Sequence, residues 1–301
     1  MLAHIRLMRP YAWLWFDGLP SLVLYTLLLP GHRSLAHYLL GLLAGICADA
    51  GITTLNDICD IDTDRASSEP SRHQRPLVVG TISRRAALWQ VVVFLCFGLG
   101  LSFYASWVFG TAVACAVVLG IGYSIRPVRL SGHPSTAQPF WILFGANFYL
   151  AVAALAGRLY TREALLWFFG TAMFMAVGEN LAKDLRDWEN DTLTGKRTSV
   201  VSLGPRRAAL ASLGGAAIGS ALYLALAWLH PSLPRWARIG TTLLLSAWFA
   251  RLAMLVWVVA RSYDKQASAR MHVGYIRTYL AFNALVAIGL NLHAVAGLVR
   301  S

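Results

Sequence analysis

The chain has 301 residues, of which 57% are hydrophobic and 13% are charged, and its formal net charge is +12. Soluble domains carry about 25% charged residues, so this composition excludes an ordinary soluble protein and indicates a membrane protein. The positive charge is also compatible with nucleic-acid binding, but the basic residues form no compact domain and are better explained by a membrane topology. We therefore expect an integral, multi-pass membrane protein surrounded by lipid, with no nucleic-acid partner.

Stretches of about 20 mostly apolar residues, the length that crosses a bilayer, recur along the chain. In order they are 12–30, 37–56, 86–105, 107–124, 137–157, 163–182, 207–229, 236–260 and 276–298. The first is expected to be a retained helix and not a cleaved signal peptide, because no small-residue cleavage site closes it. The sequence thus predicts an all-α bundle of nine transmembrane helices.

The Lys and Arg residues are divided unequally between the two ends of these predicted helices. One side holds 19 of the 26 and the other side six, while Arg251 lies within a span. The richer side comprises the N-terminus and the connections 57–85, 125–136, 183–206 and 261–275, with the adjoining Arg207 and Arg277. The positive-inside rule assigns that side to the cytoplasm, which predicts a cytoplasmic N-terminus and a C-terminus on the opposite side.

Ten of the 14 acidic residues gather in two stretches on this predicted cytoplasmic side. In each stretch three aspartates repeat one spacing, first Asp57, Asp60 and Asp64, then Asp184, Asp187 and Asp191. On a helix this spacing places each trio on one face, where like charges repel by roughly 0.2 to 0.5 kcal/mol per pair. A bound cation relieves that repulsion, and ligand sets made of oxygen favour Mg²⁺.

The repeated motif suggests an internal duplication within one domain, 1–301. A helix pair, an acidic loop and a second helix pair occupy 1–136 and again 137–275, and a last helix, 276–298, closes the bundle. Long polar loops such as those that carry the motifs are where function concentrates.

The residues around the motifs form a longer pattern. The first motif reads NDxxDxxxD from Asn56, and the second reads DxxDxxxD from Asp184, with a GxxT run from Gly195. The accompanying runs are Arg9-Pro10, then Arg72, Arg75, Pro76 and Gly80, then Tyr123-Ser124, Pro127 and Arg129-Leu130. Together they resemble the UbiA-type intramembrane prenyltransferase superfamily over residues 6–205, in the order that the family has them.

The resemblance implies that a prenyl diphosphate lies between the two motifs and is bridged by Mg²⁺. The implied metal ligands are Asn56, Asp57, Asp60, Asp64, Asp184, Asp187 and Asp191, of which Asp60, Asp64, Asp187 and Asp191 are also the implied catalytic residues. The implied substrate-binding residues are Arg9, Asn56, Arg72, Arg75, Tyr123, Arg126, Arg129, Lys183 and Arg197. Metal and arginine charges would neutralise the diphosphate as it leaves, which produces an allylic carbocation.

We therefore predict an enzyme that transfers a prenyl group from a prenyl diphosphate to a small aromatic or other lipophilic acceptor, with Mg²⁺ as cofactor and the active site facing the cytoplasm. A UbiA-type terpene cyclase, in which the substrate's own double bonds capture the cation, fits both motifs equally. A carboxylate-based ion carrier is a more distant alternative, because the acids lie at one membrane face and not at the midplane.

One position departs from the family pattern. Many members have a lysine directed at the diphosphate after the third run, where this chain has Ser131-Gly132. The cationic role of that lysine is either absent here or taken by Arg126 or Arg129.

Overall fold

The computed structural model describes residues 2–9, 19–28, 35–66, 70–130, 140, 142–143, 149, 151–193 and 195–300. Every regular element in these ranges is helical, which confirms the all-α prediction. Seven of the described helices are long and apolar enough to cross a membrane. They are Ala36–Cys59, Arg84–Ala105, Trp107–Ser124, Arg162–Arg186, Pro205–Leu229, Arg235–Arg261 and Lys265–Leu290. The other two predicted spans, 12–30 and 137–157, lie partly outside the described residues, so the count of nine stays a prediction.

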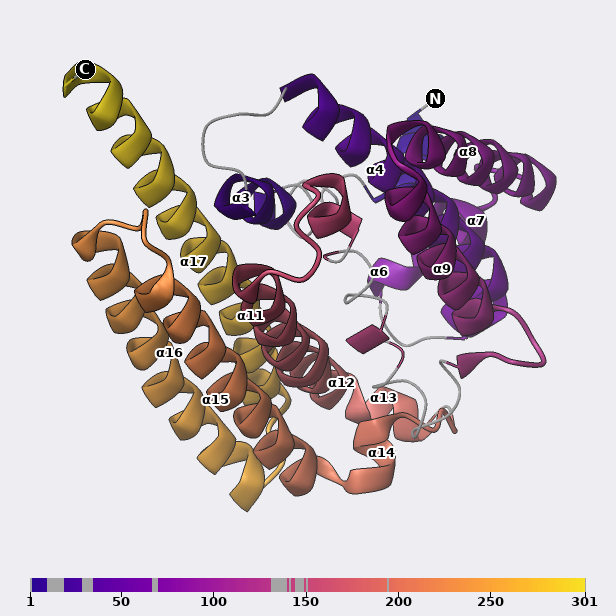
Figure 1. Cartoon of the computed structure of the whole chain (residues 1–301). Helices are drawn as coiled ribbons and strands as arrows, with labels where there is room; N and C mark the ends of the chain where they lie inside the picture. Colours follow the sequence, from indigo (N-terminus) through magenta and orange to yellow (C-terminus); the bar gives the residue numbers. More distant parts are fainter. Residues whose placement is uncertain are drawn as a thin grey trace.

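Helices from the first part of the chain pack together on one side of the molecule (Figure 1). There α4 (Leu35–Cys59) lies against α8 (Arg84–Ala105) and α9 (Trp107–Ser124). A Cβ on Gly98 would lie 2.8 Å from the backbone nitrogen of Ala48, so glycine permits this close approach. Small residues at helix contacts are the usual means by which helices associate in a bilayer.

Short helices fill the connection that follows α4. They are α5 (Ile61–Arg65), α6 (Pro70–His73) and α7 (Pro76–Val79), and α1 (Leu2–Leu7) packs on α7. Pro76 starts α7 and Gly80, at φ 79°, ends it, as expected for the first position and the end of a helix. The predicted loop 57–85 is therefore largely helical in its described part.

The second part of the chain forms the other side of the bundle (Figure 1). One long span is built from α11 (Arg162–Thr171), the π-helix η3 (Ala172–Glu179) and α12 (Asn180–Arg186). It packs on α15 (Pro205–Leu229) and α17 (Lys265–Arg300), which in turn contact α16 (Arg235–Arg261). From the first part, α3 (Leu19–Leu28) packs on α17 and α11 and so joins the two sides.

The last helix begins earlier than the sequence predicted. It starts at Lys265, whereas the predicted span starts at 276, so most of the predicted connection 261–275 is helical. Asp264 explains the start, because its Oδ1 accepts a hydrogen bond from the N–H of Ala267 at 2.9 Å. Such a cap satisfies one of the free N–H groups of the first turn.

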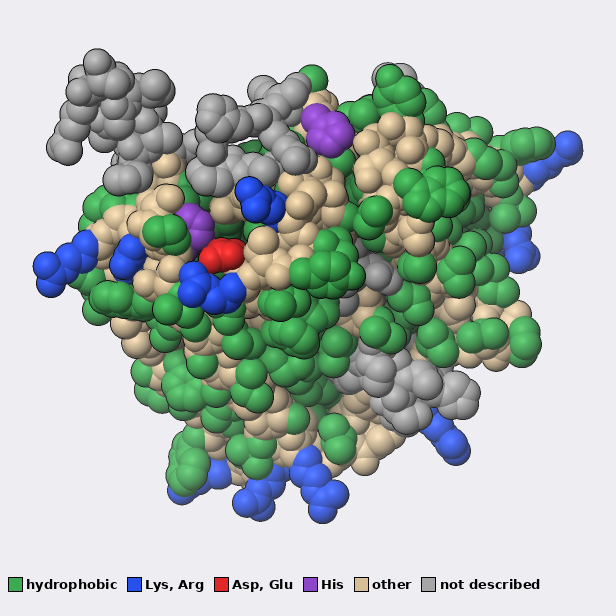
Figure 2. Space-filling view, in the orientation of Figure 1, with side chains coloured by type: hydrophobic (Ala, Val, Ile, Leu, Met, Phe, Trp, Pro, Cys, Tyr) green, Lys and Arg blue, Asp and Glu red, His purple; other side chains and the backbone are tan. Residues whose placement is uncertain are grey.

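The surface matches a bilayer environment. In Figure 2 hydrophobic side chains cover most of the visible face, and Lys and Arg side chains lie along its lower edge and toward its left and right sides. Apolar flanks with basic ends are typical of membrane-spanning bundles. The chain is thus an integral, multi-pass membrane protein.

Candidate active site

The two acidic motifs share one backbone shape. The chain passes from α4 to α5 at Asp60, with φ −97° and ψ 3°, and from α12 to α13 (Trp188–Leu193) at Asp187, with φ −93° and ψ 0°. In each motif the N–H of the third aspartate donates to the carbonyl of the middle one, at 2.8 Å for Asp64 and 2.9 Å for Asp191. The spacing places each trio on one face of an uninterrupted helix, whereas in the structure each helix is interrupted at its middle aspartate. This bridge-region conformation is sparsely allowed and recurs at active sites.

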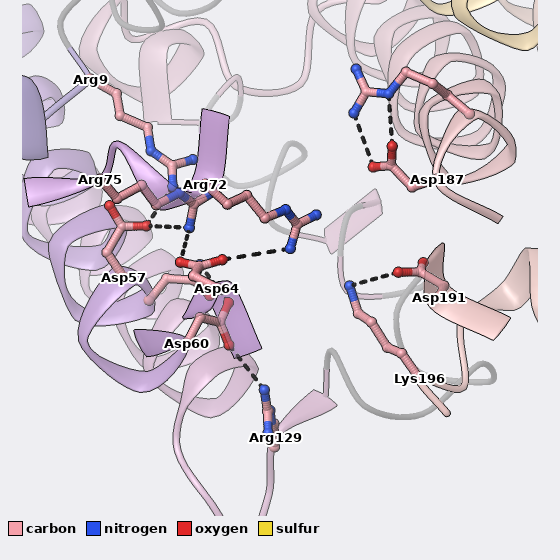
Figure 3. A network of polar contacts seen from close by, with 12 residues as sticks. Arg9, Asp57, Asp60, Asp64, Arg72, Arg75, Arg129, Asp187, Asp191 and Lys196 are labelled. Atoms are coloured by element: carbon pink, nitrogen blue, oxygen red, sulfur yellow. Dashed lines mark hydrogen bonds and ion pairs between the residues drawn. The ribbon is translucent and has the colours of Figure 1, made fainter. Parts of the chain in front are cut away.

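Arginines from outside α4 and α5 neutralise the first motif (Figure 3). Arg75, just before α7, donates to Asp57 at 3.0 Å and to Asp64 at 2.5 Å. Arg9 also donates to Asp57, at 2.5 Å, and Arg72 ion-pairs with Asp64 at 3.6 Å. Both carboxylates are buried, so cations are needed to hold them in their charged form.

The middle aspartate of the first motif has a different set of partners. The guanidinium of Arg129 donates to Asp60 at 2.9 Å, and the amide of Asn56 donates to its other oxygen at 3.2 Å. Ser124 in turn donates to the amide oxygen of Asn56 at 3.2 Å. Arg126 is exposed and forms no ion pair with an aspartate in the described part of the chain. Of the two arginines that the sequence offered, the structure brings Arg129 to the motif.

Two of these arginines have unusual backbones. Arg9, at φ 50°, and Arg129, at φ 24°, are the non-glycine residues with positive φ in the described ranges. Such conformations cost on the order of 1–3 kcal/mol and cluster at active sites, where surrounding contacts hold them. Each contacts an aspartate of the first motif, so the strain coincides with the cationic side of the site.

The second motif draws its cations from its own neighbourhood. Arg186 donates two hydrogen bonds to Asp187, at 2.8 Å and 2.9 Å. The ammonium of Lys196 lies 3.9 Å from the carboxylate of Asp191. The backbone N–H of Lys196 donates to the backbone carbonyl of Asp191 at 2.9 Å. Gly195, at φ 67°, makes the turn that returns the chain to this aspartate.

Burial and charge shift the pKa values of these carboxyl groups in opposite directions. Burial raises the pKa of Asp64 in spite of Arg75 and Arg72, and it raises the pKa of Asp191 in spite of Lys196. Burial also acts to raise the pKa of Asp187, but the bonds from Arg186 outweigh it and the pKa of Asp187 is lowered. Asp64 and Asp191 therefore stand to gain more from additional positive charge than Asp187 does.

Arg72 links the two motifs. It pairs with Asp64, and in Figure 3 its guanidinium extends toward the second motif. Its charge also acts to lower the pKa values of Asp187 and Asp191. Asp184 belongs to the same group, since the charges of Asp187, Asp191, Lys183 and Lys196 all act on it. The aspartates of both motifs thus border one site.

The side chains of this site fit a hard divalent cation. Six carboxylates and Asn56 present oxygen, the ligand that Mg²⁺ prefers. One buried oxygen of Asp64 accepts no hydrogen bond, and its ion pair with Arg72 is long, at 3.6 Å. Within the described ranges no three His, Cys, Asp or Glu side chains form a ready metal centre, so metal binding here would rely on water or substrate oxygens as further ligands.

Not every residue predicted from the sequence contacts the motifs. Tyr123 stacks on Phe140, with ring centroids 4.2 Å apart, and Arg197 is exposed. Conversely, the sequence reasoning did not include Arg186 and Lys196 among the site residues. The one sequence signal for Lys196 is its place directly after Gly195 in the GxxT run, where a turn back toward the motif is expected.

Comparison with known proteins shows which proteins this chain is similar to. The model of the UbiA prenyltransferase family matches residues 18–283. The chain is 29% identical over 267 residues to digeranylgeranylglyceryl phosphate synthase of Thermococcus kodakarensis, covering 83% of this chain and 82% of that protein. It is 29% identical over 255 residues to 4-hydroxybenzoate octaprenyltransferase of a Polaromonas species, covering 82% and 84%. A UbiA homolog from Archaeoglobus fulgidus, solved bound to GPP and Mg²⁺, has the same fold, with a TM-score of 0.68, 24% identity and coverage of 95% of this chain and 99% of that one.

Proposed function

This chain belongs to the UbiA prenyltransferase family, and from that premise we propose that it moves a prenyl group from a prenyl diphosphate to a lipophilic acceptor at the site between its two acidic motifs. The chain is a prenyltransferase in a membrane, and its relatives include the synthase and the octaprenyltransferase named above. The observation that carries the location is the position of Arg72, which pairs with Asp64 of the first motif while its charge acts on Asp187 and Asp191 of the second.

The proposed Mg²⁺ ligands are those that the sequence indicated. They are Asn56, Asp57, Asp60 and Asp64 on one side and Asp184, Asp187 and Asp191 on the other. When bound, the metal would supply positive charge to the diphosphate as the allylic carbon–oxygen bond ionises. The Archaeoglobus homolog, bound to GPP and Mg²⁺, supports this assignment through its shared fold.

The arginines on the first motif have a second role in this proposal. Without substrate they neutralise buried aspartates, and with substrate they are positioned to donate charge-assisted hydrogen bonds to the diphosphate. Arg72 suits this role best, because its ion pair with Asp64 is long, at 3.6 Å, and its guanidinium extends between the motifs. We assign to Arg129 the charge that many family members place on the lysine replaced here by Ser131.

The acceptor we propose is a small aromatic ring, whose carbon attacks the allylic cation that forms as diphosphate leaves and then loses its proton. Similarity to the Polaromonas 4-hydroxybenzoate octaprenyltransferase supports it. The second candidate is a prenylated glyceryl phosphate, whose hydroxyl attacks the same carbon, and similarity to the Thermococcus synthase favours it. Both acceptors require the same ionisation of the donor.

In the deciding experiment the purified protein and Mg²⁺ are incubated with one prenyl donor, which is geranyl, farnesyl or geranylgeranyl diphosphate. Each donor is tested with 4-hydroxybenzoate, with geranylgeranylglyceryl phosphate and without an acceptor. Mass analysis should show one prenylated acceptor and release of diphosphate. A cyclic hydrocarbon or cyclic alcohol formed equally without acceptor would instead identify a terpene cyclase. No consumption of any donor, in protein that is folded and binds Mg²⁺, would contradict the proposed function.

A further inference from the structure

Three arginines line one open pocket between α16 and α17, and none of its lining residues belongs to the acidic motifs. The pocket measures about 230 Å³, and its lining residues are Arg251, Ala269, Arg270, Val273, Gly274 and Arg277. All three arginines are exposed, and no acidic side chain contributes to the lining. The pocket therefore concentrates positive charge.

The helix contact beneath the pocket fixes its shape. On α17 the spacing of Arg270, Gly274 and Arg277 places them on one face. A Cβ on Gly274 would lie 2.2 Å from the ring of Trp248 on α16, so glycine is needed for this close contact. Trp248 lies one helical turn before Arg251, and the contact thus holds Arg251 beside the α17 face that carries the other two arginines.

These arginines reach into the predicted membrane. Arg251 and Arg277 both lie within spans, Arg235–Arg261 and Lys265–Leu290. Arg251 is six residues from Trp257, about 9 Å along the helix axis. Trp257, with Arg261 stacked on its ring at 4.1 Å, has the character of a membrane-interface residue. A charged side chain below that level is costly unless it has a partner, and is by default a functional feature.

The protein offers these charges little compensation. Arg270 donates to the side-chain oxygen of Gln266 at 3.3 Å, and none of the three arginines forms an ion pair within the described residues. Three cations around one small pocket repel one another, and a single anion between them would remove that repulsion. Arginine suits phosphate in particular, because its planar fork donates two parallel hydrogen bonds.

Exposed apolar side chains in the pocket and along α16 indicate the kind of anion. Val273 lines the pocket and is 41% exposed, and Met254 and Leu243 on α16 are 65% and 66% exposed. Their surfaces suit hydrocarbon chains, whereas the arginines suit a phosphate. We propose that this pocket binds the headgroup of an anionic phospholipid, whose acyl chains lie along α16 and α17. Basic pockets between transmembrane helices bind lipid headgroups in this way.

The experiment is native mass spectrometry of the full-length protein in detergent, titrated with dioleoyl phosphatidylglycerol or with dioleoyl phosphatidylcholine. One phosphatidylglycerol should bind saturably and more tightly than phosphatidylcholine. The double variant Arg251→Gln, Arg277→Gln should weaken phosphatidylglycerol binding by roughly tenfold or more. The matched control is Arg206→Gln, Arg207→Gln, which removes two exposed arginines from α15 and should leave binding unchanged.

A second variant keeps the proposal testable if the double variant does not fold. Val273→Glu keeps all three arginines, adds an internal anion to the pocket and should also displace the lipid. Inorganic phosphate at millimolar concentration should compete poorly, because it lacks acyl chains. Three results would each overturn the proposal. They are equal binding of the two lipids, full phosphatidylglycerol binding by both the folded double variant and Val273→Glu, and complete displacement of the lipid by inorganic phosphate.

Discussion

Asp60 and Asp187 occupy equivalent places, each at the break between two helices and each bound by an arginine. We expect Asp60→Ala or Asp187→Ala to lower turnover by roughly a hundredfold or more, because charge on the leaving diphosphate is no longer balanced. The measurement is release of diphosphate from a prenyl donor at saturating Mg²⁺.

Asp62 provides the control within the same motif. Its side chain is 99% exposed and its ion pair with Arg65 is long, at 3.9 Å. Asp62→Ala should therefore retain nearly full turnover. An Asp60→Ala or Asp187→Ala protein as active as Asp62→Ala would refute the roles assigned to the two middle aspartates.

Arg129 and Arg126 form a second matched pair, three residues apart. Arg129 contacts Asp60 and Arg126 is exposed, so Arg129→Gln should raise the KM for the prenyl diphosphate by roughly ten- to a hundredfold while Arg126→Gln leaves it unchanged. Steady-state kinetics with donor and acceptor varied in turn test this. A donor KM unchanged from that of the unsubstituted protein in both variants would mean that neither arginine replaces the family lysine.

At this scale the sequence identified the carboxylates but not their partners. Repeated aspartates in a chain poor in acid are visible without a structure. The partner of Asp60 is 69 residues away, and the choice between Arg126 and Arg129 depends on the path of the chain after α9. Arg186 and Lys196 looked like ordinary basic residues of a cytoplasmic loop, which is why they were not selected.

Helix boundaries were predictable where apolar runs end at a capping residue. The predicted 86–105 corresponds to α8, which Ser83 caps by accepting from the N–H of Ala86 at 3.2 Å. The early start of α17 and the π-helical turn of η3 were not predictable from hydropathy, because both depend on backbone hydrogen bonds and tertiary contacts. The breaks at Asp60 and Asp187 were missed for the same reason.

The contact between α15 and η3 provides a test of how the second motif is supported. A Cβ on Gly215 would lie 2.7 Å from the carbonyl oxygen of Met173 and 2.9 Å from the nitrogen of Gly178. Gly215→Ala should push the helices apart, lower the free energy of unfolding by about 1–3 kcal/mol and reduce turnover, since η3 continues directly into α12.

Gly214 is the neighbouring control, since a Cβ there would meet nothing within 4 Å. Thermal unfolding in detergent and diphosphate release should therefore be nearly unchanged in Gly214→Ala. If both alanine variants behaved alike, the close packing of α15 on η3 would not be what supports the motif.

Across the whole molecule the charges of the site nearly balance before any ligand binds. Six aspartates of the motifs face Arg9, Arg72, Arg75, Arg129, Lys183, Arg186 and Lys196. A diphosphate alone would add negative charge among buried carboxylates, so we expect tight donor binding only when a divalent metal enters with it. A non-hydrolysable prenyl diphosphate analogue should raise the unfolding temperature with Mg²⁺ and fail to do so with excess chelator. Equal stabilisation in both conditions would show that the arginines alone hold the donor.

The orientation in the membrane follows from the distribution of all basic residues. The predicted side of the motifs carries 19 of the 26 Lys and Arg, so we expect it to face the cytoplasm. In a variant without the four native cysteines, Asp62→Cys places a thiol at the motif end, and Tyr160→Cys places one just before α11, at the opposite end of the span that leads to the second motif. Both positions are strongly exposed, the Asp62 side chain at 99% and Tyr160 at 85%. An impermeant maleimide should label only the Tyr160→Cys thiol in intact cells and both thiols after permeabilisation. Labelling of Asp62→Cys in intact cells would show that the orientation is the reverse of the predicted one. The prenyl donor would then have to reach the site from outside the cell.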